Sequence, residues 1–440
     1  MSEQKLEREK ILALVKDYAK KYAGRPAFEP GKSRVNYAGR VFAEDEVVAL
    51  VDSALDAWIT LGEHGVAFER EFAKFLGMRM GLVVNSGSSA NLIAIASLCS
   101  AELGERRLKA GDEVITPALT FPTTLAPLVL YGLVPVFLDV EEGTYDIQTD
   151  KLESAITSKT RAIMIPHTLG NPCNMDRIMD VVKKHKLYLI EDTCDALDSL
   201  WDGKKVGSFG DFSTYSFYAA HHMTMGEGGA VLTNNMELAK IARSIRDWGR
   251  ACWCATGEKH PQGACRNRFG HDFPGLPKGY DHKYTYTNIG FNLKPTDLQA
   301  AVGRVQLQKV PEFTKARKKN FAALHEFFSK HEKYFILPRA HAKADPSWFS
   351  FPLTLREKLP FSRNELVQFL EGRNIETRMI FSGNILNHPA YSQVEHRICG
   401  DLKQTTRVMN DAFFLGLFPG IGDKHIAYML DAVTDFLKKY

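Results

Sequence analysis

Short runs of branched apolar residues alternate with helical patterns along the first 300 residues, and this alternation constrains the fold more than any other feature. The runs are GLVV, DEVIT, VPVFLDV, RAIMIP and LYLIED, and helical segments such as SSANLIAIASL and DRIMDVVKKHK lie between them. Strands buried on both faces are rich in Val and Ile, and strands joined through helices run parallel. The pattern therefore predicts an α/β fold, with a mostly parallel sheet covered by helices on both faces.

The pattern changes after about Thr296. A long helical segment, TDLQAAVGRVQLQKV, is followed by SWFSFPLTL and RNELVQFLEG, which are typical of a smaller α+β unit. We predict three parts: an N-terminal helical segment at 1–45, a large α/β domain at 46–300, and a small C-terminal α+β domain at 301–440.

Composition excludes several classes of protein. Charged residues make up 25% of the 440 residues and the net charge is only +4, so neither nucleic acid nor a membrane is an expected partner. There is no run of about eighteen apolar residues, and the charged start, MSEQKLEREKILALVKDYAKKY, predicts an amphipathic helix rather than a signal peptide. We expect a cytoplasmic protein.

Two segments place polar groups where predicted strands end. In VVNSGSSAN a strand runs into a helix that Ser88 or Ser89 could cap, and free N–H groups at a helix start bind phosphate. In LYLIEDTCDA, Asp192 closes a buried strand, where open α/β sheets bind ligands, and its carboxylate could hold a protonated pyridine nitrogen. Taken alone, the first segment also fits an ordinary capped helix, and the second also fits a structural salt bridge.

Two further segments contain candidate site residues. Phe121, in TPALTFPTT, follows a strand end and could stack on a flat cofactor, although core packing is the usual fate of a phenylalanine. STYSFYAAHHMTMGEGGAVLT places Ser216 on a strand and two adjacent histidines, His221 and His222, on the loop that follows.

Together these segments give the chain a resemblance to a known family. The chain resembles the sugar aminotransferases named after DegT, DnrJ and EryC1, over nearly its whole length, in GVAFEREFAKFLG, NSGSSAN, TFPTT, IPHTLGNPCNMD, IEDTCDA, VGSFGDFSTYSFY, GEGGAVLT and NIGFNLKPTDLQAAVGRVQL. The resemblance implies the aspartate aminotransferase fold (fold type I), a vitamin B6 cofactor bound by the large domain, and a site built across a homodimer interface.

The same resemblance implies a role for individual residues. Asp192 would hold the pyridine nitrogen and Phe121 would stack on the ring. The phosphate would be bound by Gly87, Ser88 and Ser216, and Asn292 would reach the phosphate in the neighbouring subunit. Asp195 stands where aminotransferase relatives often have histidine, and Tyr218 replaces the histidine of their SFH motif.

The chain departs from the aminotransferases at their central lysine. That lysine lies five residues after the strand serine and binds the cofactor covalently, but here the position is His221, and no lysine occurs between Lys205 and Lys240. Imidazole has no primary amine, so pyridoxal phosphate has no covalent anchor, whereas pyridoxamine 5′-phosphate (PMP) needs none. A histidine at this position is a suitable base for proton transfer at the cofactor's C4′ carbon. We expect C3 dehydration of a 4-keto sugar rather than transamination. His222 is expected to support the loop or His221 rather than to act as the base. The alternative is that His221 has no catalytic role and the protein is inactive.

Four of the seven cysteines form a candidate metal-binding set. Cys252 and Cys254 flank Trp253, Cys265 follows the segment ATGEKHPQGA, and Cys194 lies beside Asp192. Four thiolates suit a 2Fe–2S cluster and could also bind zinc, so the spacing leaves both open, and ordinary buried or exposed thiols are a third possibility.

The histidine and the cysteines together resemble one branch of the family, the CDP-4-keto-6-deoxy-D-glucose 3-dehydrases of 3,6-dideoxyhexose biosynthesis. This resemblance implies PMP, a nucleotide-sugar substrate and a 2Fe–2S cluster bound by Cys194, Cys252, Cys254 and, after a short insertion, Cys265. It also implies an outside electron donor, an NADH-dependent flavin and iron–sulfur reductase, and the lack of a flavin or nicotinamide motif in the sequence is consistent with such a donor. Two alternatives remain: a cluster-free, glutamate-using 3-dehydratase of the GDP-4-keto-6-deoxy-mannose type, and a non-catalytic regulator.

Overall fold

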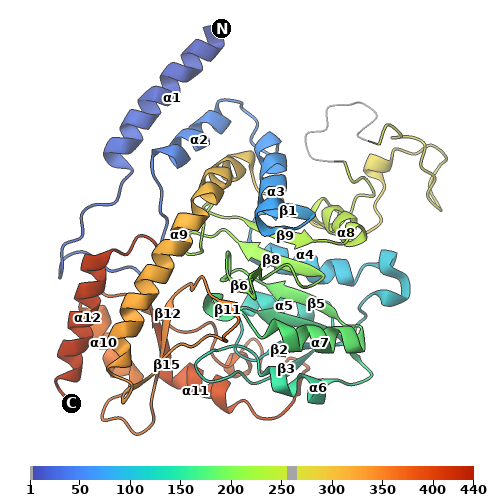
Figure 1. Ribbon diagram of the computed structural model, residues 1–440. Helices are drawn as coiled ribbons and strands as arrows, with labels where there is room; N and C mark the ends of the chain where they lie inside the picture. Colours follow the sequence, from blue (N-terminus) through green and yellow to red (C-terminus); the bar gives the residue numbers. More distant parts are fainter. Residues whose placement is uncertain (1–2, 255–264) are drawn as a thin grey trace.

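The computed structural model describes residues 3–254 and 265–440 (Figure 1). Within these ranges the largest sheet has eight strands in the order β1-β9-β8-β5-β4-β2-β3-β14. In chain order they are β1 (Met80–Val84), β2 (Glu113–Pro117), β3 (Val134–Leu138), β4 (Thr160–Pro166), β5 (Tyr188–Asp192), β8 (Phe212–Ser216), β9 (Gly229–Thr233) and β14 (Arg397–Ile398). Only β9 runs antiparallel to its neighbours, β1 and β8. The predicted α/β fold with a mostly parallel sheet is confirmed.

Helices cover both faces of this sheet, because successive residues of a strand point to opposite sides. In β1, Leu82 and Val84 pack in one core cluster, whereas Val83 packs in another on the opposite face. The first face is covered by α4 (Gly87–Leu98), α5 (Pro122–Leu130) and α8 (Met236–Arg246). The second is covered by α3 (Glu63–Leu76), α6 (Leu152–Ala155), α7 (Met175–His185) and the first half of α9 (Asp297–Ser329). Burial on both faces explains why these strands are continuous apolar runs.

The C-terminal part of the chain has a core of its own. Its antiparallel sheet has the order β10-β12-β15-β13, with α10 (Arg363–Gly372), α11 (Lys403–Asp411) and α12 (Asp423–Leu437) around it. The strands are β10 (Phe335–Ile336), β12 (Phe351–Leu355), β13 (Thr377–Arg378) and β15 (Ala412–Leu415). A smaller sheet contains β6 (Leu200–Trp201), β7 (Lys204–Lys205) and β11 (Ala344–Asp345).

Helix α9 joins the two cores. It begins at a capping box in which Thr296 and Gln299 satisfy each other's backbone N–H groups. Leu307 packs in the core beneath β1, whereas Leu324 and Phe328 pack in the C-terminal core. In Figure 1 it is the long helix that runs past both sheets.

Three features bear on the predicted division at 1–45, 46–300 and 301–440, which stays a prediction. Residue 300 falls inside α9, and β14 pairs with β3 although it comes from the C-terminal range. Near the N-terminus, α1 (Glu3–Tyr22) extends away from the sheets (Figure 1), and Arg8 joins it to α2 (Glu44–Ala54) through an ion pair of 2.6 Å with Asp52.

None of the helices in the described ranges is both long and apolar enough to cross a bilayer.

Candidate functional site

A cavity of about 460 Å³ lies at the carboxyl ends of β1, β2, β4, β5 and β8, where open α/β sheets bind ligands. Side chains from the C-terminal part, among them Phe349, Arg378 and Phe381, close its other side. The cavity brings together most of the predicted site residues, namely Gly87, Ser88, Phe121, Asp192, Asp195, Ser216, Tyr218 and His221, and also Cys194.

Asp192 ends β5, and its carboxylate is held by neutral donors. Its Oδ2 accepts hydrogen bonds from Asn91 Nδ2 at 2.8 Å and from Thr124 Oγ1 at 2.7 Å, and its Oδ1 accepts one from the Cys194 N–H at 3.2 Å. The residue is only 6% exposed. No lysine or arginine in the described ranges forms an ion pair with it, so the alternative of a structural salt bridge is not supported. A buried carboxylate favours a cationic partner, and this one lines a cavity that can admit it.

The turn from β1 into α4 forms another wall. The helix begins at Gly87, and Ser86 caps it by accepting a hydrogen bond from the Ser89 N–H at 3.1 Å. The expectation that Ser88 or Ser89 would cap the helix is wrong, because the helix begins before both residues. The N–H groups of the first turn have no partner inside the helix, as in phosphate-binding helix starts.

Gly87 is confined by its neighbours. A β-carbon at this position would lie 2.6 Å from Ser216 Cβ and 3.0 Å from Cys194 Sγ. The start of α4 therefore packs directly against the ends of β8 and β5, and its free N–H groups lie beside the Ser216 hydroxyl. Phe121, at the N-cap position of α5, is 50% exposed and lines the same cavity, so its ring face is available for stacking.

His221 lies on the loop between β8 and β9, facing Asp195. Its Nδ1 is 3.2 Å from Asp195 Oδ1, and its ring centroid is 5.6 Å from that of Phe349. On α9, burial lowers the pKa of Arg317 to about 9, and the nearby Asp195 acts in the opposite direction. The contact with Asp195 orients the imidazole of His221 at the cavity.

His222 points into the protein instead. It is 3% exposed, and its Nε2 lies 2.6 Å from the Ser347 carbonyl, to which it donates. Burial lowers the pKa of His222 well below its ordinary value, and the charge of Arg317 lowers it further. The ring is therefore neutral and anchors the loop.

Backbone contacts fix the shape of this loop. The Phe217 N–H donates to the Gly228 carbonyl at 2.8 Å, and the Phe217 carbonyl accepts from the Met225 N–H at 2.9 Å and from Thr224 Oγ1 at 3.0 Å. Gln306 on α9 accepts a hydrogen bond from the Thr224 N–H at 3.2 Å.

Sequence reasoning did not assign three residues of the site. Asn91 and Thr124 hold Asp192. His167 lines the cavity; its Nδ1 accepts a hydrogen bond from the Cys173 N–H at 3.1 Å, so its Nε2 carries the proton and donates to Glu191 at 3.1 Å. Asn91 could have been found, since it lies one helical turn after Gly87 and so shares its face.

Asn292 does not line the cavity. It is exposed, and its Oδ1 accepts a hydrogen bond from Lys294 Nζ at 2.6 Å. Its predicted contact with a neighbouring subunit stays a prediction.

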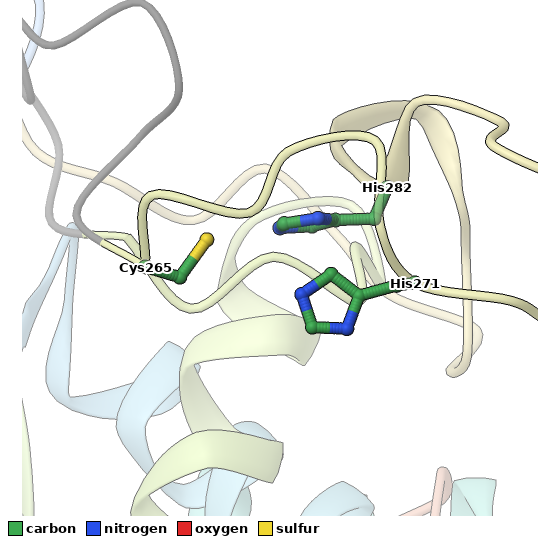
Figure 2. Close-up of side chains that lie close together, drawn as sticks. All are labelled: Cys265, His271 and His282. Carbon is green, nitrogen blue, oxygen red and sulfur yellow. The ribbon is translucent and has the colours of Figure 1, made fainter.

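The four cysteines of the predicted cluster lie in two regions. Cys194 lines the cavity, whereas Cys252 and Cys254 follow α8, where burial raises the pKa of Cys252 to about 11. In the described ranges, no three of the four thiols lie within 4.8 Å of one another, and the group that does meet this distance is Cys265 with His271 and His282 (Figure 2). The insertion between Cys254 and Cys265, residues 255–264, lies outside the described residues.

Comparison with known proteins identifies the family. Residues 42–434 match the DegT/DnrJ/EryC1/StrS aminotransferase family, and the chain belongs to it. It is 49% identical over 98% of its length to dTDP-4-dehydro-2,6-dideoxy-D-glucose 3-dehydratase of Saccharopolyspora spinosa, covering 92% of that protein. It is 47% identical, over 98% of both chains, to the lipopolysaccharide biosynthesis protein RfbH of Salmonella typhimurium.

A solved structure confirms the fold. E. coli GDP-4-keto-6-deoxy-D-mannose-3-dehydratase with bound hydrated pyridoxal phosphate is 28% identical, with a TM-score of 0.81 over 91% of this chain and 100% of that one. The predicted fold of pyridoxal-phosphate-dependent aminotransferases is confirmed.

The cavity fits the family's vitamin B6 cofactor on its own geometry. It offers a buried carboxylate suited to a pyridinium nitrogen, a helix start beside a serine hydroxyl for the phosphate, and an exposed aromatic ring for stacking.

Proposed function

We propose that this protein is a PMP-dependent nucleotide-sugar 3-dehydrase that removes the C3 hydroxyl of a nucleotide-linked 4-keto-6-deoxyhexose. The observation that carries the proposal is His221 at the cavity, next to Asp195, in a chain with no lysine between Lys205 and Lys240. The relative named as a 3-dehydratase supports the reaction class, and the relative named as the lipopolysaccharide biosynthesis protein RfbH supports a role in polysaccharide biosynthesis. CDP-4-keto-6-deoxy-D-glucose is the substrate we propose first, in 3,6-dideoxyhexose biosynthesis.

When bound, PMP would supply an amine that condenses with the C4 ketone and a ring that takes up the electrons released by loss of the C4′ proton, and an electron pair would then leave with the C3 hydroxyl. Asp192 keeps the pyridine nitrogen protonated, since Asn91 and Thr124 hold its carboxylate in place without neutralising it. Phe121 orients the ring by stacking. The phosphate is bound by the start of α4 at Gly87 and Ser88 and by Ser216, with Tyr218 beside them.

His221 is the proton-transfer residue. Asp195 contacts its Nδ1 and stabilises the imidazolium that forms when Nε2 takes a proton from C4′. The ring can then deliver that proton to the departing hydroxyl. Because imidazole is not an amine, the residue exchanges protons without holding the cofactor covalently.

We further propose that completing a 3-deoxy sugar requires two electrons from outside the chain. A 2Fe–2S cluster would be held by four thiolates, those of Cys194, Cys252, Cys254 and Cys265. An NADH-dependent flavin and iron–sulfur reductase would supply electrons to this cluster. The four thiols suit such a cluster by type, and the position of Cys194 at the cavity supports a link to the cofactor. In the described ranges no three of these thiols lie within 4.8 Å of one another, and the proposed mechanism routes no step through the cluster. We also propose a homodimer in which Asn292 completes the neighbouring site.

The experiment is turnover by the anaerobically purified protein with PMP. CDP- and dTDP-4-keto-6-deoxyglucose are compared, each with and without the reductase, and His221→Gln serves as the inactive control that still binds PMP. We expect a 3-deoxy product only with the reductase. Turnover with glutamate and no reductase would favour the cluster-free 3-dehydratase, and failure to bind PMP would favour a non-catalytic protein.

A further inference from the structure

A second cavity, of about 560 Å³, is formed mostly by the connection between α1 and α2, and we call it the N-terminal cavity. His425, near the start of α12, completes its wall. In Figure 1 this connection passes the N-terminal end of α12, and the rings of Phe28 and His425 stack with their centroids 4.0 Å apart. Most of the lining residues precede residue 42, where the match to the family begins, so the family match gives this cavity no role.

The charged side chains that line the N-terminal cavity are all basic. None of the aspartates and glutamates of the described residues lines it, whereas three arginines and a histidine do, namely Arg25, Arg34, Arg40 and His425. Arg34 is neutralised by Glu376, with which it forms an ion pair of 2.9 Å. Arg25 contacts a carbonyl and the Phe418 ring, and Arg40 contacts the Phe42 ring, but in the described ranges neither forms an ion pair with a carboxylate.

Arg25 is held in one position at this cavity. Its Nη2 donates to the Arg40 carbonyl, and its guanidinium carbon lies 4.6 Å from the centroid of the Phe418 ring. Gly420 leaves room for the guanidinium, because a β-carbon there would lie 2.1 Å from Arg25 Nη1. Gly420 does not have a positive φ, so the close approach of Arg25, and not the backbone conformation, requires glycine at this position.

The two arginines without an acidic partner lie close enough to repel each other. Burial lowers the pKa of Arg25, and the positive charge of Arg40 lowers it further. Charged groups that a structure holds against such repulsion are typical of binding sites. His425 adds a neutral donor, because its Nδ1 accepts a hydrogen bond from the Gly422 N–H at 3.2 Å and its Nε2 therefore carries the proton.

We propose that the N-terminal cavity binds a diphosphate group, with the guanidinium groups of Arg25 and Arg40 donating to its oxygens. A guanidinium presents its N–H groups in a planar fork that matches phosphate oxygens, and hydrogen bonds between charged groups are stronger than those between neutral ones. The cavity is in the size range of small-molecule sites, so it has room for a nucleoside attached to the diphosphate.

Two ligands carry this chemistry, a nucleotide-linked sugar and a free nucleoside diphosphate. The N-terminal cavity adjoins the cofactor cavity along one segment, because Asn36 and Gly39 line the former and Tyr37 lines the latter. A nucleotide-linked sugar with its ketone at the cofactor could therefore place its diphosphate between Arg25 and Arg40, and only this assignment rests on the proposed function. A free nucleoside diphosphate would make the same contacts with the two arginines.

The test is calorimetric titration of the PMP-loaded protein with inorganic pyrophosphate at low ionic strength. Because PMP occupies the phosphate site at the start of α4, the titration reports on the N-terminal cavity. We expect one pyrophosphate per chain, with binding at least tenfold weaker in Arg25→Gln and in Arg40→Gln. Gly420→Ala should also weaken binding at least tenfold, because the new methyl group would displace the Arg25 guanidinium without removing its charge.

Two matched variants control for the loss of one charge and for the added methyl group. Arg106→Gln removes an exposed arginine that pairs with Glu237, and Gly372→Ala places a β-carbon where no atom lies within 4 Å. Both should bind pyrophosphate as the unmodified protein does, and circular dichroism checks that every variant folds. No pyrophosphate binding by the unmodified protein, or unchanged binding by Arg25→Gln and Arg40→Gln, would overturn the proposal.

The source of the diphosphate is identified with CDP-4-keto-6-deoxyglucose, measured in the His221→Gln background, where no turnover is expected. If pyrophosphate competes with this sugar nucleotide and Arg25→Gln weakens the binding of both, the site is confirmed as one for the substrate's diphosphate. If Arg25→Gln leaves the sugar nucleotide unaffected while CDP competes with pyrophosphate, the site is confirmed as one for a free nucleotide. Pyrophosphate binding through Arg25 in a protein that dehydrates no sugar would count against the proposed function alone.

Discussion

Substituting Gly87 with alanine tests whether the start of α4 binds the cofactor phosphate. The new β-carbon would lie 2.6 Å from Ser216 Cβ, about 1 Å inside ordinary carbon–carbon contact. Ser216 Cβ is bonded directly to the backbone of β8, which is paired on both sides with β5 and β9, so it cannot rotate away. Such overpacking costs about 1–3 kcal/mol, and the clash is relieved only when α4 moves away from β8.

We expect Gly87→Ala to lower the free energy of unfolding by about 1–3 kcal/mol and to raise the Kd for PMP at least tenfold. Urea unfolding measures the free energy of unfolding, and titration of the metal-free protein with PMP measures the Kd. Gly372→Ala is the matched control, because a β-carbon at the end of α10 would meet no atom within 4 Å. If Gly87→Ala loses stability as expected yet binds PMP with unchanged affinity, the phosphate does not lie at the start of α4.

Three further predictions concern the site and the sheet. His221→Lys should attach pyridoxal phosphate covalently and shift activity toward transamination, detectable as an added mass after borohydride reduction; a variant that binds the cofactor without this adduct would show that residue 221 is not at the lysine position. Asp192→Asn removes one partner of a buried charge pair and should weaken PMP binding by about 3 kcal/mol, measured by calorimetry, and an unchanged affinity would refute the pyridinium contact. Hydrogen bonds from Arg397 lower the pKa of Glu113 to about 2 from its usual 4.5, so its contribution to stability is complete above pH 4.5 and is lost as the pH falls toward 2. Glu113→Gln should lower the free energy of unfolding at pH 7 by about 1–2 kcal/mol and flatten its decline below pH 4.5, and an unaltered pH profile would contradict this.

The fold was largely predictable, because its central strands are buried on both faces. Runs such as RAIMIP and LYLIED have few competing interpretations once they alternate with amphipathic helices. The pairing of β14 with β3 was not predictable, since Arg397 and Ile398 make a two-residue strand with no periodicity. Arg397 also forms an ion pair with Glu113 at the start of β2, the strand on the other side of β3, and this contact joins residues far apart in sequence.

The candidate site was predictable where a residue type follows a strand end, as with Asp192, Phe121 and Gly87. The groups that support these residues were harder to find. Asn91 lies in a helix that looks apolar throughout, and its role depends on the distance to Asp192. The convergence of Cys265, His271 and His282 was not predicted either, because histidines in an irregular segment have no spacing signal of their own.

The contacts that shape the loop carrying His221 determine how the loop responds to substitution at this position. The loop's backbone is fixed through Phe217, Thr224, Met225, Gly228 and Gln306, and the side chain at position 221 takes part in none of these hydrogen bonds. The backbone conformation of the loop therefore does not depend on a hydrogen bond from the side chain at position 221. An exchange at position 221 loses the contacts of His221 with Asp195 and Phe349 but leaves these backbone hydrogen bonds in place, so the loop keeps its shape while the chemistry at the cavity changes.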